Sequence, residues 1–213
     1  MTQITDRAGT LCLTAAALIV SSELLRLAVG LFSGPDSAAT LTHSLTYGLA
    51  LVGMYALLLA LTAVYFGHQR ALGALGLVGY LTATAGTVLV AGDWWFETFG
   101  VPMIGAHAPE VLKLPPGGSI LAGALITVGL FATGWITFGV AAFRSGVFSR
   151  PAAALLVVGG ACSMPLALST PYQIPLAFAV GWIGHTLIRA SRHERPVPRT
   201  APASSVAGEL QSR

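Results

Sequence analysis

The sequence predicts an all-α fold, a polytopic transmembrane bundle of six helices with both termini in the cytoplasm. Hydrophobic residues make up 54% of the chain and charged residues only 9%, and the mean hydropathy is +0.76. A soluble protein of this size needs more polar surface than that. In addition, the apolar residues form runs of about 20, the length that crosses a bilayer as a helix, and Lys and Arg gather in alternate connections between these runs.

The first runs are separated by residues that break helices. A polar lead precedes the first run, but Glu23 and Arg26 inside the run argue against a cleaved signal peptide. Gly34 and Pro35 stop this run, because neither residue continues a helix cheaply. The second run ends at Gly67–Arg70 and the third at Gly92–Asp93. The six predicted spans are 9–32, 41–66, 71–91, 119–143, 151–168 and 172–190.

The later part of the chain divides in the same way. The longest connection, 93–118, is rich in Trp, Phe and Pro, and we expect it to lie at the outer membrane interface. The fourth run leads to Arg144, the short fifth run closes at Pro171, and the sixth ends in arginines. Residues 1–192 therefore form one six-helix domain. The Pro-, Ala-, Ser- and Arg-rich residues 193–213 are predicted to be a disordered basic cytoplasmic tail.

The positions of the charged residues predict the orientation. With six spans, the basic residues Arg7, Arg70, Arg144, Arg150 and those of the tail share one side, which is cytoplasmic by the positive-inside rule. The outer connections instead hold Lys113 and the acidic residues Asp36, Asp93, Glu97 and Glu110. A bias toward Arg over Lys, with abundant Ala and Gly, is typical of a GC-rich bacterial genome. It indicates a bacterial plasma membrane.

Glu23 and Arg26 are the most informative pair of residues. Ionisable side chains inside a span are costly and face the bundle interior, a cavity or each other. Three residues apart, these two share a helix face and can form an ion pair, while Arg26 can also extend toward the membrane surface. Two interpretations stay open: an ion pair that anchors the helix, or a polar site for a ligand or ion.

The segment 93–99 alternates aromatic side chains with two carboxylates four residues apart. Trp and Phe suit the lipid headgroup region, so the segment is either an interfacial aromatic belt or a short surface helix. The alternative is a lid over an outward cavity, in which Asp93 or Glu97 meets Arg26 at a similar depth. The predicted polar ligand site consists of Glu23, Arg26, Asp93 and Glu97.

The sequence offers little support for other chemistry. His107 and Glu110 are types of residue that bind metals, but they lack a metal-binding pattern and no metal site is predicted. Lys113 lies in a loop, so a retinal Schiff base within the membrane is excluded. Nucleotide-binding loops and hydrolase motifs are missing, no cofactor is predicted, and the catalytic residues of any enzyme are unknown.

Membrane lipids are the expected partners, and no nucleic-acid partner is predicted. Small residues four apart allow helices to approach closely, either within one chain or in a homo- or hetero-oligomer. The pairs are Gly79 and Ala83, Gly123 and Thr127, Gly159 and Ser163, and Ala177 and Gly181.

Two stretches carry a resemblance to known sequences. Residues 92–102 read GDWWFETFGVP, and residues 134–151 read GWITFGVAAFRSGVFSRP, followed by AAALLVVGG. Over about 41–188 the chain resembles a broad group of uncharacterised multi-span membrane proteins common in actinobacteria. This resemblance implies a fold and a membrane location, and it implies no catalytic residue.

These features favour a non-enzymatic plasma-membrane module that takes part in small-solute or lipophile binding and passage, or serves as a partner subunit. The alternative from another class is an intramembrane enzyme that acts on a lipid or quinone headgroup, with Glu23 or Asp93 as acid or base. A purely structural partner is the third interpretation.

Overall fold

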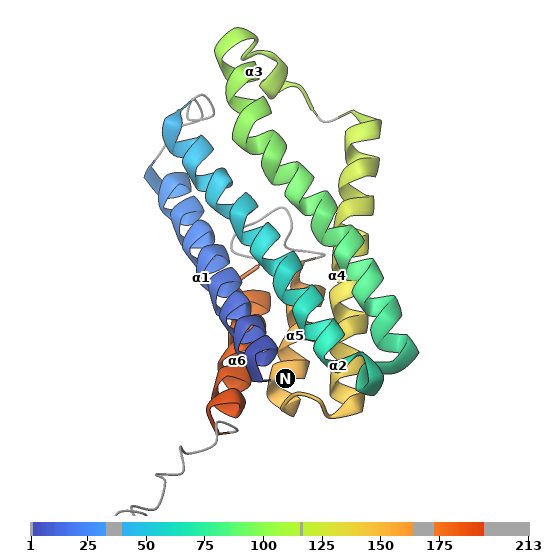
Figure 1. Ribbon diagram of the computed structural model, residues 1–213. Coiled ribbons are helices and arrows are strands. Elements are labelled where there is room, and N and C mark those ends of the chain that lie inside the picture. The colour runs from blue at the N-terminus through green and yellow to red at the C-terminus, as the bar shows by residue number, and fades with distance from the viewer. Residues whose placement is uncertain (1, 33–39, 116, 164–172, 194–213) are drawn as a thin grey trace, which may run out of the picture.

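The computed structural model describes residues 2–32, 40–115, 117–163 and 173–193, and every regular element in these ranges is helical (Figure 1). This confirms the all-α class. The stretches Asp6–Val29, Leu41–His107 and Gly118–Ser145 are long and apolar enough to cross a membrane. The elements are α1 (Thr2–Phe32), α2 (Leu41–Trp95), η2 (Phe96–Gly100), α3 (Val101–His107), η3 (Val111–Lys113), α4 (Gly118–Ser145), α5 (Arg150–Cys162) and α6 (Ile174–His193).

Helix α2 contains a reversal that divides it into two antiparallel arms. Gly73 has φ 62° and ψ −160°, a conformation that is essentially restricted to glycine. The rings of Tyr65 and Tyr80 stack 4.3 Å apart, whereas fifteen residues of straight helix would separate them by about 22 Å. We call residues 41–72 the first arm and residues 74–95 the second arm; Figure 1 shows the chain reversing between them.

Two helices, 41–66 and 71–91, are expected here from the sequence, and the structure differs in the position of the turn, which lies at Gly73 and not at Gly67–Arg70. The polar residues Gln69 and Arg70 remain helical, since solvent-exposed polar side chains do not by themselves stop a helix. The chain turns instead where glycine permits a positive φ.

Substituting Gly73 with alanine is expected to destabilise the protein by about 1–3 kcal/mol, because a Cβ is strained at this φ and ψ. No atom lies within 4 Å of the added carbon, so the cost comes from the backbone and not from a clash. Gly67→Ala is the matched control, because its surroundings are equally open and its φ is not positive. Thermal unfolding in detergent measures both; equal midpoints for the two variants would contradict the assignment of strain.

The helices pack around the two arms of α2. Helix α1 lies against α2 and α6, α4 lies against α2 and α5, and α5 lies against α6. Large side chains fill the centre, with Phe131, Trp135 and Phe138 of α4 at most 2% exposed. By contrast, many leucines and valines point outward, among them Leu59 and Val78. An apolar exterior of this kind suits a lipid environment.

Close helix contacts depend on small residues, as predicted. A Cβ on Gly79 or Gly86 would collide with the backbone of α4, and a Cβ on Gly134 would collide with the backbone at Ala83. Gly159 meets Leu176 of α6, and Gly181 meets Ala16 of α1. Of the four predicted pairs, Gly123 and Thr127 differ: nothing described lies within 4 Å of a Cβ on Gly123.

The segment predicted as an interfacial connection, 93–118, is mostly helical. Helix α2 runs on to Trp95 and continues through η2 and α3 as far as His107. Pro102 lies at the start of α3, directly after the π-helical turn η2. The predicted turn at Asp36, the ends of the fifth and sixth spans around 164–172, and the tail from 194 lie outside the described residues.

Candidate functional site

Helix α1 contributes a buried ion pair. An Nη1 of Arg26 donates to Oε1 of Glu23 at 2.9 Å, and the two side chains are 11% and 1% exposed. The spacing of three residues places both groups on one helix face. Each charge therefore compensates for the removal of the other from solvent, a cost that would otherwise be several kcal/mol per ion.

Two aromatic rings from the arms of α2 enclose the Arg26 guanidinium. Its Cζ lies 4.8 Å from the ring centre of Trp94 and 5.5 Å from that of Tyr47, and the two rings are 5.5 Å apart. Both distances to the cation are within the range of a cation–π interaction. Tyr47 belongs to the first arm and Trp94 to the second, so the arginine of α1 joins all three helical segments.

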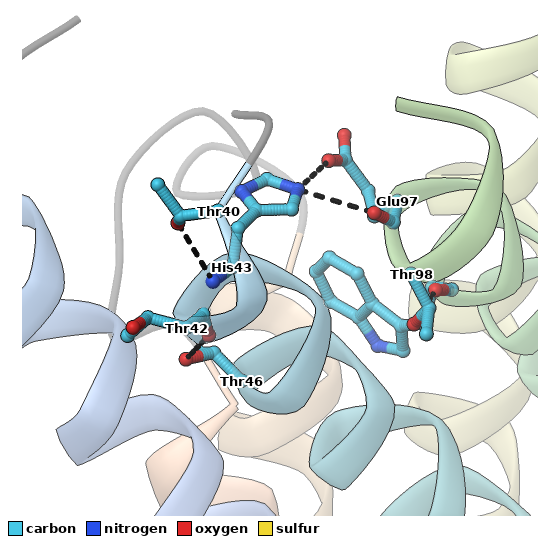
Figure 2. A network of polar contacts seen from close by, with 7 residues as sticks. Thr40, Thr42, His43, Thr46, Glu97 and Thr98 are labelled. Atoms are coloured by element: carbon cyan, nitrogen blue, oxygen red, sulfur yellow. Dashed lines mark hydrogen bonds and ion pairs between the residues drawn. The ribbon is translucent and has the colours of Figure 1, made fainter. Parts of the chain in front are cut away.

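A second polar contact joins the start of the first arm to η2, which follows the second arm (Figure 2). Nε2 of His43 lies 3.2 Å from Oε2 of Glu97 and 3.1 Å from the Glu97 carbonyl oxygen. Both partners are acceptors, so Nε2 carries the hydrogen. The backbone N–H of His43 donates to Oγ1 of Thr40, which caps the start of α2. The centre of the His43 ring lies 4.4 Å from that of the Tyr47 ring.

Glu97 lies in a π-helical turn, η2. Here Thr98 is buried, and its hydroxyl donates to the Trp94 carbonyl at 2.6 Å. π-Helical turns are rare and occur frequently at functional sites. The turn places Glu97 beside His43 while Trp94, one helical turn earlier, faces Arg26.

We call Glu23, Arg26, His43, Tyr47, Asp93, Trp94 and Glu97 the Arg26 cluster. The guanidinium interacts electrostatically with the carboxylates of Asp93 and Glu97 as well as with Glu23. Three carboxylates therefore interact with one guanidinium, and the cluster has a formal charge of −2 when all three are ionised and His43 is neutral. Asp93 is exposed and Glu97 is 30% exposed, whereas Glu23 is fully buried. The cluster thus extends from the surface into the bundle.

One buried polar atom of Glu23 and one of Trp94 lack a hydrogen-bond partner among the described residues. They are Oε2 of Glu23, whose other oxygen binds Arg26, and Nε1 of Trp94, which is 4% exposed. Buried polar groups are paired in the great majority of cases, with protein or with a bound molecule. These two atoms are therefore candidates for contact with a ligand or a water molecule.

The structure brings all four predicted site residues, Glu23, Arg26, Asp93 and Glu97, into one cluster. Arg26 is in direct contact with Glu23, whereas the carboxylates of Asp93 and Glu97 interact with its charge at longer range. Sequence reasoning missed His43, Tyr47 and Trp94. His43 and Tyr47 are four residues apart and therefore share one helix face. This spacing indicates a common site only once the second arm is known to lie opposite that face.

Other candidates lie apart from the cluster. Nδ1 of His107 binds the Met103 carbonyl at 2.9 Å within its own helix. Within the described ranges, no three His, Cys, Asp or Glu side chains are grouped so that they could hold a metal ion. Cys12 and Cys162 are free thiols.

Comparison with known proteins provides no relative for this chain. No family model, no curated protein and no solved structure matches it.

Proposed function

We propose that the chain is a multi-pass protein of a bacterial plasma membrane, related to the actinobacterial group that its sequence resembles. The two arms of α2 together with α1, α4, α5 and α6 make six crossings, and the termini are cytoplasmic. Figure 1 supports this arrangement: the start of α1, the turn of α2 and the connection from α4 to α5 share one end. That end carries Arg70, Arg144 and Arg150, which are retained in the cytoplasm.

In this orientation the Arg26 cluster faces outward, and its role is non-enzymatic binding of a small solute or lipophile. The observation that carries the proposal is the fully buried carboxylate of Glu23 with one unpartnered oxygen. A site that only anchors a helix gains nothing from an unsatisfied buried acceptor, which costs about 1–3 kcal/mol. A bound molecule that donates to this oxygen removes the cost. Transport of the solute across the membrane, or a role as a subunit of a larger complex, would depend on this binding.

Native mass spectrometry of the protein released in mild detergent tests the proposal. We expect the wild-type chain to retain a reproducible small mass and Glu97→Gln to lose most of it, because the substitution removes one of the three negative charges. Glu110→Gln is the control, since it makes the same change on an exposed side chain of the same segment. A wild-type chain without retained mass, or equal retention by the two variants, would contradict the proposal.

The contact between His43 and Glu97 favours a second candidate, an intramembrane enzyme acting on a lipid or quinone headgroup. A histidine oriented by a carboxylate is a common acid–base arrangement. This candidate predicts that a retained lipid or quinone is converted on incubation and that His43→Gln stops the conversion. Retention of an unchanged molecule over the same period favours the binding role.

A further inference from the structure

We propose that the ligand of the Arg26 cluster is a primary ammonium group with an oxygen acceptor on a neighbouring carbon, as in ethanolamine. The inference rests on the proposed binding function and names the chemical class that the site takes.

The charge of the cluster favours a cation. The carboxylates of Glu23, Asp93 and Glu97 outnumber the single guanidinium of Arg26, and opposite charges attract more strongly where protein and lipid exclude water. An anionic ligand would have to approach all three carboxylates. The rings of Tyr47 and Trp94 already contact the Arg26 guanidinium, so the carboxylates are the groups that hold the ligand's ammonium.

The two unpartnered atoms specify the hydrogen bonds that the ligand makes. Oε2 of Glu23 is an acceptor in a carboxylate, so its missing partner is a donor; Nε1 of Trp94 is only a donor, so its missing partner is an acceptor. Both residues contact the Arg26 guanidinium, Glu23 by its other oxygen at 2.9 Å and Trp94 by its ring at 4.8 Å. On this proposal, one small molecule beside Arg26 serves both atoms.

These requirements discriminate between related amines. A primary ammonium has N–H groups that donate to Glu23, whereas a quaternary ammonium has none. An oxygen two carbons away can accept from the Trp94 indole, whereas a simple alkylamine has no acceptor. Ethanolamine meets both requirements with separate groups. Choline has no N–H and must serve both atoms with its single hydroxyl, and ethylamine has no acceptor.

Isothermal titration calorimetry of the full-length protein in detergent tests the inference with these three amines. We expect ethanolamine to bind at least tenfold more tightly than choline, with ethylamine between them. Trp94→Phe keeps a ring for Arg26 and removes the N–H, so it should abolish the preference for ethanolamine over ethylamine. Trp95→Phe is the control because Trp95 is 54% exposed, and it should keep the preference. Equal binding of choline and ethanolamine, or an unchanged preference in Trp94→Phe, would overturn the inference.

The same headgroup chemistry occurs free and in phosphatidylethanolamine. Nanodiscs that contain equal amounts of phosphatidylethanolamine and phosphatidylcholine separate the two sources. Enrichment of phosphatidylethanolamine on the protein in native mass spectra supports the lipid, and binding of soluble ethanolamine without enrichment supports the free amine. If neither is seen while another mass is retained, the ligand class is wrong and the binding function stands. If nothing is retained and none of the amines binds, water alone serves the two atoms and both proposals fail.

Discussion

Replacing Arg26 with alanine is expected to destabilise the protein by about 3–5 kcal/mol, because it leaves the Glu23 carboxylate buried without its counter-charge. Glu23 is fully buried and its Oε1 accepts from Arg26 at 2.9 Å. The variant also loses the contact of the guanidinium with Trp94 at 4.8 Å. Thermal unfolding in detergent, followed by tryptophan fluorescence, measures the loss. Arg70→Ala is the control, since Arg70 is exposed and should change stability by less than about 0.5 kcal/mol.

A double-mutant cycle identifies the origin of this effect. When both members of a buried ion pair are replaced by apolar residues of similar volume, the change is often neutral or stabilising. We therefore expect Glu23→Leu combined with Arg26→Met to recover most of the stability that Arg26→Ala loses. If Arg26→Ala alone lowers the stability by less than about 1 kcal/mol, the ion pair is hydrated and weakly coupled, like a pair on a protein surface. In that case the burial assigned to Glu23 is wrong.

This expectation changes how the site should be tested. A loss of binding in Arg26→Ala would not separate a ligand contact from partial unfolding. Trp94→Phe and Glu97→Gln are better probes, because each retains most of the volume of the native side chain. Their controls, Trp95→Phe and Glu110→Gln, lie in the same part of the chain.

Substituting Gly134 with alanine is expected to separate α4 from the second arm of α2 and to destabilise the protein by about 1–3 kcal/mol or more. The added Cβ would overlap the backbone at Ala83, and a backbone cannot rotate away as a side chain can. Gly86 faces the backbone at Phe131 in the same way, so Gly86→Ala should have a similar effect. The two helices meet along a seam with no space for a methyl group.

The control for Gly134→Ala is a glycine of the same helix whose replacement is expected to raise the stability of the protein. Nothing lies within 4 Å of a Cβ added to Gly129, so Gly129→Ala should stabilise α4 by about 0.5–1 kcal/mol through the helix propensity of alanine. Unfolding midpoints of the two variants, measured side by side in one detergent, decide the matter. Similar midpoints for Gly129→Ala and Gly134→Ala would show that α4 does not pack against α2 as described.

The helical class was predictable because its signals are local. Runs of apolar residues and the breakers between them are properties of the chain itself, and the described part of the structure is helical throughout its regular elements. The position of the reversal in α2 was not predicted correctly. Polar residues at Gln69 and Arg70 suggested a turn, but a turn also needs a backbone conformation, which Gly73 supplies three residues later.

The candidate site was predictable only in part, for a related reason. Glu23 and Arg26 stand out because charges are rare inside apolar runs, and Asp93 and Glu97 stand out among aromatic residues. His43 and Tyr47 share one helix face, but this signal is weak because a histidine and a tyrosine near the end of a span suit an interface equally well.

From the sequence alone follow the all-helical class, the apolar helices suited to a membrane and the four charged residues of the cluster, since each depends on residue type and local spacing. The tertiary structure decided which groups meet. His43 and Glu97 are 54 positions apart, and they come into contact because the chain reverses at Gly73 and because small residues hold the second arm against α4. Contacts of this kind depend on where two helices cross. That position results from packing over the whole bundle and cannot be derived from the sequence of either segment alone.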